Sequence, residues 1–295
     1  MPETQQQQFD LLTPILLRTI SGRSGSTLMM QLIGTSDQVV FDRVSPYEVR
    51  YLTYLARWAI ALRELHPSTD DWNFGTMYPD PGGFVGPFPV PTAEFWDGEY
   101  LWKHALLSVW EGFSKAIAAK KANVPRPIYY AEKCAPWLPM YLKDVLPFRV
   151  IFLVRDPRDI FLSIKAFNKK RGYPAFGRRR WEGDMAFAKR WVKLIQKRVA
   201  TVKSELELFK GMLIKYENLI ANLHGETTRL GDWLNIRLNT ETVEGGVEKH
   251  RHHITSDNPS LSVERWKREM PPRLRSFLTN ELYEELNYFN YDVEI

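Results

Sequence analysis

The chain has 295 residues, and hydrophobic residues make up 44% of them, which is enough for one substantial core. Its single cysteine, Cys134, excludes an internal disulfide, and no apolar run reaches the ~18 residues that a membrane-spanning helix needs. The net charge of +5 does not by itself indicate a nucleic-acid-binding protein, because it suits an anionic small molecule equally well.

The first predicted elements form a strand, a turn and a helix. A strand at Ile15–Leu17 leads into a turn with Gly22 and Gly25, and a helix follows over Ser26–Ile33. A helix N-terminus offers free N–H groups and a positive dipole end to an anion, although a plain strand-to-helix turn has the same pattern. The ATP- and GTP-binding loop carries a lysine directly after its last glycine. Here no lysine follows Gly25, and the nearest cation is Arg23.

A long segment without clear helix or strand signal follows a short strand at Gln38–Asp42 and a helix at Tyr47–Leu65. This segment, Pro67–Tyr100, is rich in proline, glycine and aromatic residues. Such loops inside a compact domain are functional or disordered, and the aromatics are too many for a disordered linker. We expect an ordered lid over a ligand pocket, suited to a cationic or amphipathic small molecule. The alternative is a surface loop anchored to the core by its aromatic side chains.

A second candidate anion site follows another apolar strand. The strand ends at Arg155, Pro157 stands where a helix would begin, and Asp156 is placed to cap that helix. Ser163 falls roughly two turns along the helix. An arginine at a strand end and a helix hydroxyl can bind one phosphate together. The alternative is that Arg155 forms a salt bridge with Asp156 or Asp159.

Strands and helices alternate along the whole chain, which predicts a parallel sheet with helices on both faces. Ligands bind beyond the carboxyl ends of such strands, where Ser21–Thr27, Lys133 and Arg155 all fall. We therefore predict an α/β fold with a P-loop-like central parallel sheet. It forms a single domain over residues 11–295 with a long lid loop, preceded by a flexible polar N-terminus at 1–10.

The two anion segments together resemble the sulfotransferase superfamily, which uses the donor 3′-phosphoadenosine 5′-phosphosulfate (PAPS). A loop of the type P-R-S-G-[ST]-T binds the phosphosulfate in that family, and an R-[ND]-P-x-D element with a later serine binds the 3′-phosphate. The resemblance assigns the phosphosulfate to Arg23, Ser24, Gly25, Ser26 and Thr27, and the 3′-phosphate to Arg155 and Ser163. The chain departs from the pattern at Ser21 and Gly22, which replace a proline-containing lead-in.

Two later segments extend the resemblance over nearly the whole chain, with the bacterial-type and tyrosylprotein sulfotransferases as the nearest branch. GMLIKYENL is similar to a family strand whose tyrosine, here Tyr216, faces the 3′-phosphate. SVERWK is similar to a late segment that folds over the donor, which implies that Ser262, Arg265 and Trp266 close the donor site. The alternative for Trp266 is ordinary packing, because large aromatics dominate protein cores.

The resemblance also implies the catalytic groups. Glu48, in SPYEVR, stands where related branches place a glutamate base, although it could instead pair with Arg50 or Tyr51 on a solvated helix face. Lys133, in IYYAEKCAP, is similar to a family lysine that stabilises charge on the leaving oxygen, and it could also protonate that oxygen. Arg23 would assist from the loop.

The histidines are weaker candidates. His104 differs in spacing from the histidine base of the cytosolic branch, lies within a predicted helix and is better explained as a partly buried polar residue. His250, His252 and His253 lack the cysteine or carboxylate spacing of a zinc site, so we predict no metal. Their segment is expected to be a loop near the acceptor or the 3′-phosphate.

The implied reaction is in-line, metal-independent transfer of a sulfonate from PAPS to a hydroxyl or nitrogen of a natural-product-like small molecule, leaving the bisphosphate PAP. Sulfation of a peptide tyrosine or carbohydrate is an alternative, and a P-loop kinase or NTPase or a non-catalytic nucleotide- or RNA-binding protein is a more remote one.

We expect no nucleic-acid or membrane partner and a monomer or homodimer. Met1–Asp10 is polar and does not read as a signal peptide, which predicts a cytoplasmic protein. The basic run Lys169–Arg180 is expected to be a solvated, mobile loop beside the 3′-phosphate.

Overall fold

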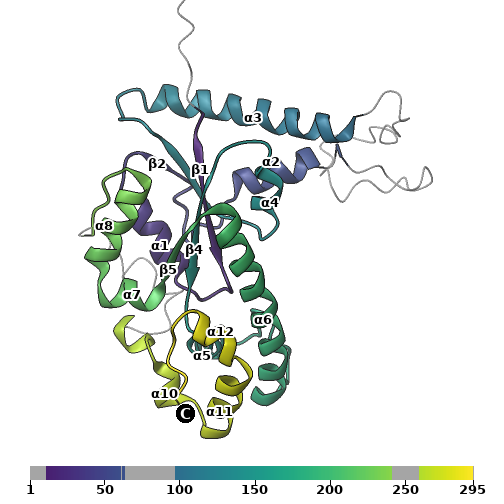
Figure 1. The fold of residues 1–295 in the computed structure, drawn as a ribbon, viewed down its shortest axis with the longest axis vertical. Helices are drawn as coiled ribbons and strands as arrows, with labels where there is room; N and C mark the ends of the chain where they lie inside the picture. The colour runs from purple at the N-terminus through teal and green to yellow at the C-terminus, as the bar shows by residue number, and fades with distance from the viewer. Residues whose placement is uncertain (1–10, 61, 64–96, 241–258, 295) are drawn as a thin grey trace, which may run out of the picture.

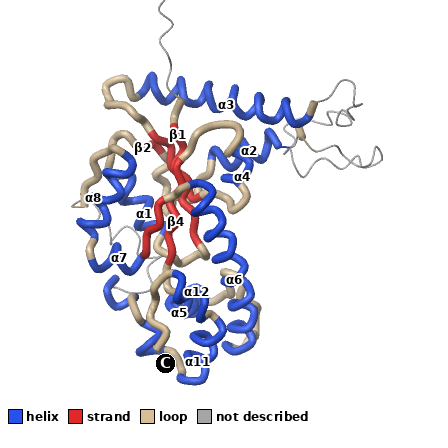
Figure 2. Tube along the Cα trace, viewed as in Figure 1, coloured by secondary structure: helices blue, strands red, loops and turns tan. Residues whose placement is uncertain are grey.

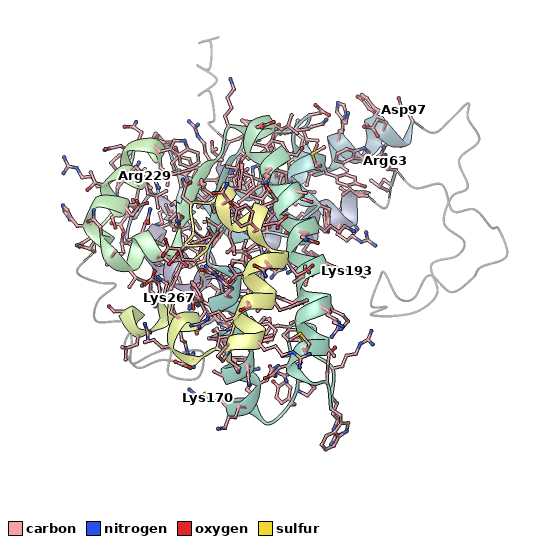
Figure 3. The ribbon with its side chains drawn as sticks, turned by 60° about the horizontal axis from the view of Figure 1, so that its bottom comes forward. Arg63, Asp97, Lys170, Lys193, Arg229 and Lys267 are labelled. Atoms are coloured by element: carbon pink, nitrogen blue, oxygen red, sulfur yellow. The ribbon has the colours of Figure 1, made fainter. Side chains whose placement is uncertain are left out.

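The computed structural model describes residues 11–60, 62–63, 97–240 and 259–294 (Figure 1). The predicted flexible N-terminus, the predicted lid up to residue 96 and the histidines at 250, 252 and 253 lie outside the described residues. Arg63 and Asp97, which border the undescribed segment 64–96, lie close together in Figure 3, and Arg63 forms an ion pair with Glu99 at 3.0 Å. The described residues on either side of segment 64–96 therefore lie beside the start of α3 (Gly98–Lys120).

A sheet of five parallel strands forms the centre of the protein, with helices on both sides (Figure 2). The strand order is β2-β3-β1-β4-β5. The strands are β1 (Thr13–Thr19), β2 (Val39–Val40), β3 (Tyr129–Lys133), β4 (Arg149–Val154) and β5 (Met212–Lys215). Ile15, Leu16 and Leu17 of the central strand β1 are all buried, as expected when both faces of a parallel sheet are covered. The predicted α/β class with a central parallel sheet is confirmed.

Two hydrophobic cores cover the two faces of the sheet. Because side chains alternate along a strand, Ile15 and Leu17 belong to one core and Leu16 to the other. The first core is completed by α1 (Ser26–Ile33), α7 (Tyr216–Ala221) and α8 (Leu223–Leu234). The second is completed by α2 (Tyr51–Ile60), α3 (Gly98–Lys120), α4 (Leu138–Leu142), α5 (Pro157–Arg171), α6 (Asp184–Phe209), α10 (Arg265–Glu269), α11 (Pro272–Glu281) and α12 (Tyr283–Tyr288). A short 3-10 helix, η3 (Pro259–Ser262), precedes α10.

Most predicted elements occur at the expected positions, and three differences concern the site. Helix α2 begins at Tyr51 rather than at Tyr47, because Tyr47 has a φ of 63°, which a right-handed helix cannot include. Glu48 therefore lies in the connection before α2. The predicted strand at Gln38–Asp42 is reduced to Val39–Val40 at the sheet edge.

The third difference is that Lys169–Arg171, predicted as part of a loop, form the last turn of α5, which ends at Gly172 with a φ of 75°. Lys170, in this last turn of α5, lies at the lower end of the molecule in Figure 3. No helix in the described part of the chain is both long enough and apolar enough to cross a membrane.

Candidate active site

The predicted site residues gather at the carboxyl end of the sheet. Gly25 lies in the turn after β1, Lys133 is the last residue of β3, Arg155 follows β4 and Tyr216 follows β5. Because the strands are parallel, all four positions fall at the same edge of the sheet.

The loop before α1 has the backbone of an anion-binding turn. Gly25 caps α1 with a φ of 91° and without a side-chain hydrogen bond to the helix. A Cβ atom at this position would overlap the Tyr216 ring, so both the backbone conformation and the space require glycine. The loop therefore presents the positive end of α1 without a bulky side chain at the cap.

Arg23 extends from this loop toward α5. Its Nε atom donates to Ser163 Oγ at 3.2 Å, and its guanidinium lies 4.6 Å from the centre of the Phe167 ring. Burial, and secondarily the charge of Arg155, lowers the pKa of Arg23 to about 10, so its side chain is still a cation at neutral pH. The two predicted half-sites are thus joined by a direct side-chain contact between Arg23 and Ser163.

Arg155 joins the same two half-sites through backbone groups. Its Nη1 atom donates to the carbonyl of Arg23 at 3.0 Å and its Nη2 atom to the carbonyl of Ser262 at 2.8 Å. Its Nε atom is buried without a hydrogen-bond partner among the described residues. Asp156 forms its ion pair with Arg158 at 2.7 Å, and among the described residues Arg155 pairs with neither Asp156 nor Asp159, so the salt-bridge alternative is not what the structure contains.

Tyr216 lies between the loop and Arg155. Its ring covers Gly25 and lies 4.5 Å from the Arg155 guanidinium, and its hydroxyl shares a hydrogen bond of 3.0 Å with Ser262 Oγ. Tyr216 and Ser262 therefore lie in contact with residues of both predicted half-sites.

Trp266 contacts α5, and Arg265 forms an ion pair within its own helix, α10. Trp266 is only 2% exposed, its ring lies 3.5 Å from the Arg158 guanidinium, and its backbone N–H donates to Asp159 Oδ1 at 2.9 Å. Arg265 forms an ion pair with Glu269 at 2.7 Å. The Trp266 contacts match the packing alternative, and the donor-closing roles of both residues stay predictions.

Lys133 and Glu48 lie next to each other at the start of α1. Lys133 Nζ donates to Glu48 Oε1 at 2.9 Å, to Thr27 Oγ1 at 3.2 Å and to the carbonyl of Pro46 at 2.5 Å. The second oxygen of Glu48 pairs with Arg50 Nη2 at 2.8 Å. The predicted base and the predicted lysine are thus in contact, at the N-terminus of α1.

The Glu48–Lys133 contact also sets the charge of both groups. Burial alone would raise the pKa of Glu48, but hydrogen bonds and charge from Lys133 and then Arg50 bring it below the ordinary value. Burial lowers the pKa of Lys133, and Glu48 opposes that shift. Glu48 remains 48% exposed and can therefore meet an acceptor.

A buried polar network behind Arg155 has no counterpart among the predicted site residues. Glu217 accepts the Asp156 N–H at 2.8 Å and the Tyr291 hydroxyl at 3.1 Å. Arg158 binds the Asp156 carboxylate and donates to the carbonyl of Asp292 at 2.6 Å. These contacts tie the C-terminal segment to the second half-site. The signal that could have indicated it is Glu217 itself, which directly follows Tyr216.

His104 lies on α3, where its Nδ1 atom is 2.8 Å from the Tyr100 carbonyl and its ring stacks on Tyr100 at 3.7 Å. Both contacts lie within its own helix, and the His104 side chain is exposed, so the expectation of a partly buried residue is wrong. Within the described ranges, no three histidine, cysteine, aspartate or glutamate residues are grouped as a metal site would require.

A cavity of about 730 Å³ lies away from this site, lined by residues that include Gln38, Val124 and His224. Gln38 and Val124 precede β2 and β3, whereas the site residues follow their strands. This cavity therefore belongs to the opposite edge of the sheet.

A parallel sheet of this order, with a glycine-containing turn after β1 and cationic side chains at the carboxyl ends of β3 and β4, defines an α/β protein with a P-loop-like sheet. The chain belongs to the sulfotransferase family, whose model matches residues 21–240. No curated protein matches the chain significantly.

Two solved structures have a similar fold. The sulfotransferase domain from the curacin biosynthetic pathway is 17% identical, with a TM-score of 0.54 over 97% of this chain and 99% of that one. The sulfotransferase domain of the Synechococcus PCC 7002 olefin synthase is 15% identical, with a TM-score of 0.52 over 99% of both chains. The likeness confirms the sulfotransferase fold over nearly the whole chain.

Arg155→Ala is expected to weaken binding of PAP about 10- to 100-fold, because charge-assisted hydrogen bonds contribute most to anion binding. The turnover number of the enzyme saturated with donor should change less. Isothermal titration calorimetry with PAP measures the first effect and kcat at saturating PAPS the second. Arg149→Ala, at the other end of β4, is the matched control. Equal loss of donor affinity in Arg155→Ala, Glu48→Gln and Lys133→Ala would contradict the separation of roles.

Asp159→Asn is expected to flatten the pH dependence of stability. Burial, and then the charge of Asp156, raises the pKa of Asp159 from 3.8 to about 7. The folded protein therefore binds more protons than the unfolded chain between these values, and stability falls as the pH rises through that window. Asparagine does not titrate, so the melting temperature of the Asp159→Asn protein should fall less than that of the wild type as the pH rises from 3.8 to about 7. Calorimetry of both proteins, with exposed Asp232→Asn as control, checks this, and parallel curves would contradict it.

Proposed function

We propose that this sulfotransferase uses PAPS as its donor. The observation that carries the proposal is the Glu48–Lys133–Thr27 contact at the N-terminus of α1, beside Arg23 and Arg155. The residues present fit a nucleotide that is anionic at two points. The N-cap residue of α1, Gly25, makes no side-chain cap hydrogen bond, and the buried Nε atom of Arg155 lacks a partner in the described structure.

In this proposal the loop residues Arg23, Ser24, Gly25, Ser26 and Thr27 bind the 5′-phosphosulfate. Arg155, Ser163 and Tyr216 bind the 3′-phosphate, and Ser262, Arg265 and Trp266 close the donor site. The contacts of Tyr216 with Gly25 and Arg155 support this assignment, because one ring orders both half-sites. The backbone carbonyl of Ser262 supports it further by fixing Arg155 Nη2.

PAPS would supply the sulfonate. The residues of the chain position the reacting groups and stabilise the charge that develops during transfer. Glu48 removes the proton from the acceptor hydroxyl or amine as the new bond to sulfur forms. Lys133 and Arg23 stabilise the negative charge that develops on the phosphate oxygen as the old bond to sulfur breaks, and the product nucleotide is PAP. The acceptor keeps the sulfonate, and the proton resides on Glu48.

The proposed acceptor is a small, natural-product-like molecule with a hydroxyl or amine. The similar folds come from curacin and olefin biosynthesis, which fits an acceptor of that kind. The half-exposed carboxylate of Glu48 supports access for a small molecule.

The test uses the full chain with radiolabelled PAPS and a panel of phenols, aliphatic alcohols, amines, a tyrosine peptide and an oligosaccharide. We expect label in one small-molecule class, with release of one PAP for each product. Transfer only to the peptide or oligosaccharide would overturn the acceptor class. Failure to bind PAP, or magnesium-dependent ATP hydrolysis, would overturn the donor.

A further inference from the structure

The start of α2 is held by side chains from β3 rather than by its own residues. The N–H groups of Tyr51, Leu52 and Thr53 are the ones a helix leaves without intrahelical partners. Tyr51 N–H donates to the Tyr130 hydroxyl at 3.0 Å, Leu52 N–H to Glu132 Oε2 at 3.0 Å and Thr53 N–H to Glu132 Oε1 at 3.1 Å. All three N–H groups are thus satisfied by Tyr130 and Glu132.

The Glu132 carboxylate is buried at the start of α2 and accepts hydrogen bonds from its N–H groups. Its side chain is 0% exposed, and besides the two N–H groups it accepts hydrogen bonds from the hydroxyls of Thr53 at 2.5 Å and Tyr130 at 2.9 Å. A buried carboxylate is costly unless its oxygens are fully hydrogen-bonded, and the positive end of a helix favours its charge. The carboxylate is therefore well suited to fix where α2 begins.

The same strand also holds the opposite end of the connection that carries Glu48. Lys133, the neighbour of Glu132, points to the other face of β3, where it binds Thr27 and the carbonyl of Pro46. Pro46 comes before Glu48 in the sequence and Tyr51 comes after it. Lys133 therefore anchors the connection on one side of Glu48, and Glu132 anchors it on the other.

We infer that Glu132 is a positioning residue for the sulfonate transfer: by fixing the start of α2, it holds the Glu48 carboxylate against Lys133. The inference rests on the proposed role of Glu48 as the base. Only two residues separate Glu48 from Tyr51, so a shift of the helix start moves Glu48 directly. Displacements of about 1 Å in a reacting group can cost on the order of 100-fold in rate.

The test is Glu132→Gln, which keeps the side-chain size but places an amide NH₂ against backbone N–H donors. We expect kcat to fall about 10- to 100-fold with the best acceptor of the panel, with the calorimetric Kd for PAP unchanged. Amide hydrogen exchange in the PAP complex should become faster in the 47–55 peptide. Glu205→Gln is the matched control, because Glu205 is also buried but pairs with Arg18, and it should leave kcat and the exchange of this peptide unchanged.

A double-mutant cycle separates this role from general structural damage. If Glu132 acts through Glu48, Glu132→Gln slows the wild-type enzyme but causes no further loss in Glu48→Gln. An equal loss in both backgrounds would overturn the inference. If Glu132→Gln does not fold, Tyr130→Phe is the second variant, because it removes the hydroxyl that accepts the Tyr51 N–H. Wild-type kcat and wild-type hydrogen exchange in Tyr130→Phe would also overturn the inference. Wild-type kcat in Glu48→Gln would instead overturn the proposed base, and the inference with it.

Discussion

Lys133→Ala should lower kcat about 100- to 1,000-fold, the effect of removing one group that stabilises developing charge in a site shielded from water. Lys133 Nζ already lies within hydrogen-bonding distance of Glu48 and Thr27, so its ammonium is placed between the proposed base and the helix N-terminus. PAP affinity should change little, because Arg155 and the loop backbone remain. Initial rates at saturating PAPS and calorimetry with PAP measure the two quantities.

Lys143→Ala, which removes an exposed lysine at the end of α4, is the control for loss of a positive charge. It should keep the wild-type kcat. If Lys133→Ala instead weakened PAP binding as strongly as it slowed turnover, Lys133 would be a donor-binding residue rather than a catalytic one.

Glu48→Gln should lower kcat about 100- to 10,000-fold, the range for loss of a positioned general base. The amide keeps the size of the side chain and can still accept a hydrogen bond from Lys133, but it cannot take a proton. PAP affinity should again be retained. Glu281→Gln, an exposed position on α11, is the matched control.

The pH profile gives an independent check of Glu48. Since Lys133 and Arg50 hold its pKa below 4.5 despite burial, Glu48 is ionised at neutral pH. On the acid side, turnover by the wild-type enzyme should therefore fall as the pH drops through this lowered pKa and the base is protonated. Glu48→Gln should lack that acid limb. An unchanged limb in Glu48→Gln would assign the titration to another group.

Much of the fold follows from local sequence patterns. The apolar runs within β1 and β4 indicated strands buried on both faces, and Gly25 and Pro157 marked helix starts that the structure confirms. Because parallel strands end at one edge of the sheet, Lys133 and Arg155 could be placed at a common site before any contact was known.

The contacts within the site depend on the tertiary fold and could not be predicted in the same way. Glu48 and Lys133 are 85 residues apart, and their pairing requires the non-helical connection before α2, in which Tyr47 has a positive φ. Nothing local distinguishes Glu132 from a surface glutamate, because its partners lie 79 and 80 residues away on α2. Trp266 likewise looks the same in sequence whether it covers a nucleotide or packs on Arg158.

The hydrogen bonds that join residues 291 and 292 to the second half-site determine when that half-site can form during protein synthesis. The Asp292 carbonyl binds Arg158 across 134 residues, and Tyr291 reaches Glu217 across 74. A growing chain on the ribosome exposes β1, β3 and β4 well before it has released these partners, and contacts of such long range form late. We therefore expect the proposed nucleotide donor to stabilise a chain that includes residues 291 and 292 and to have little effect on a nascent chain that lacks them.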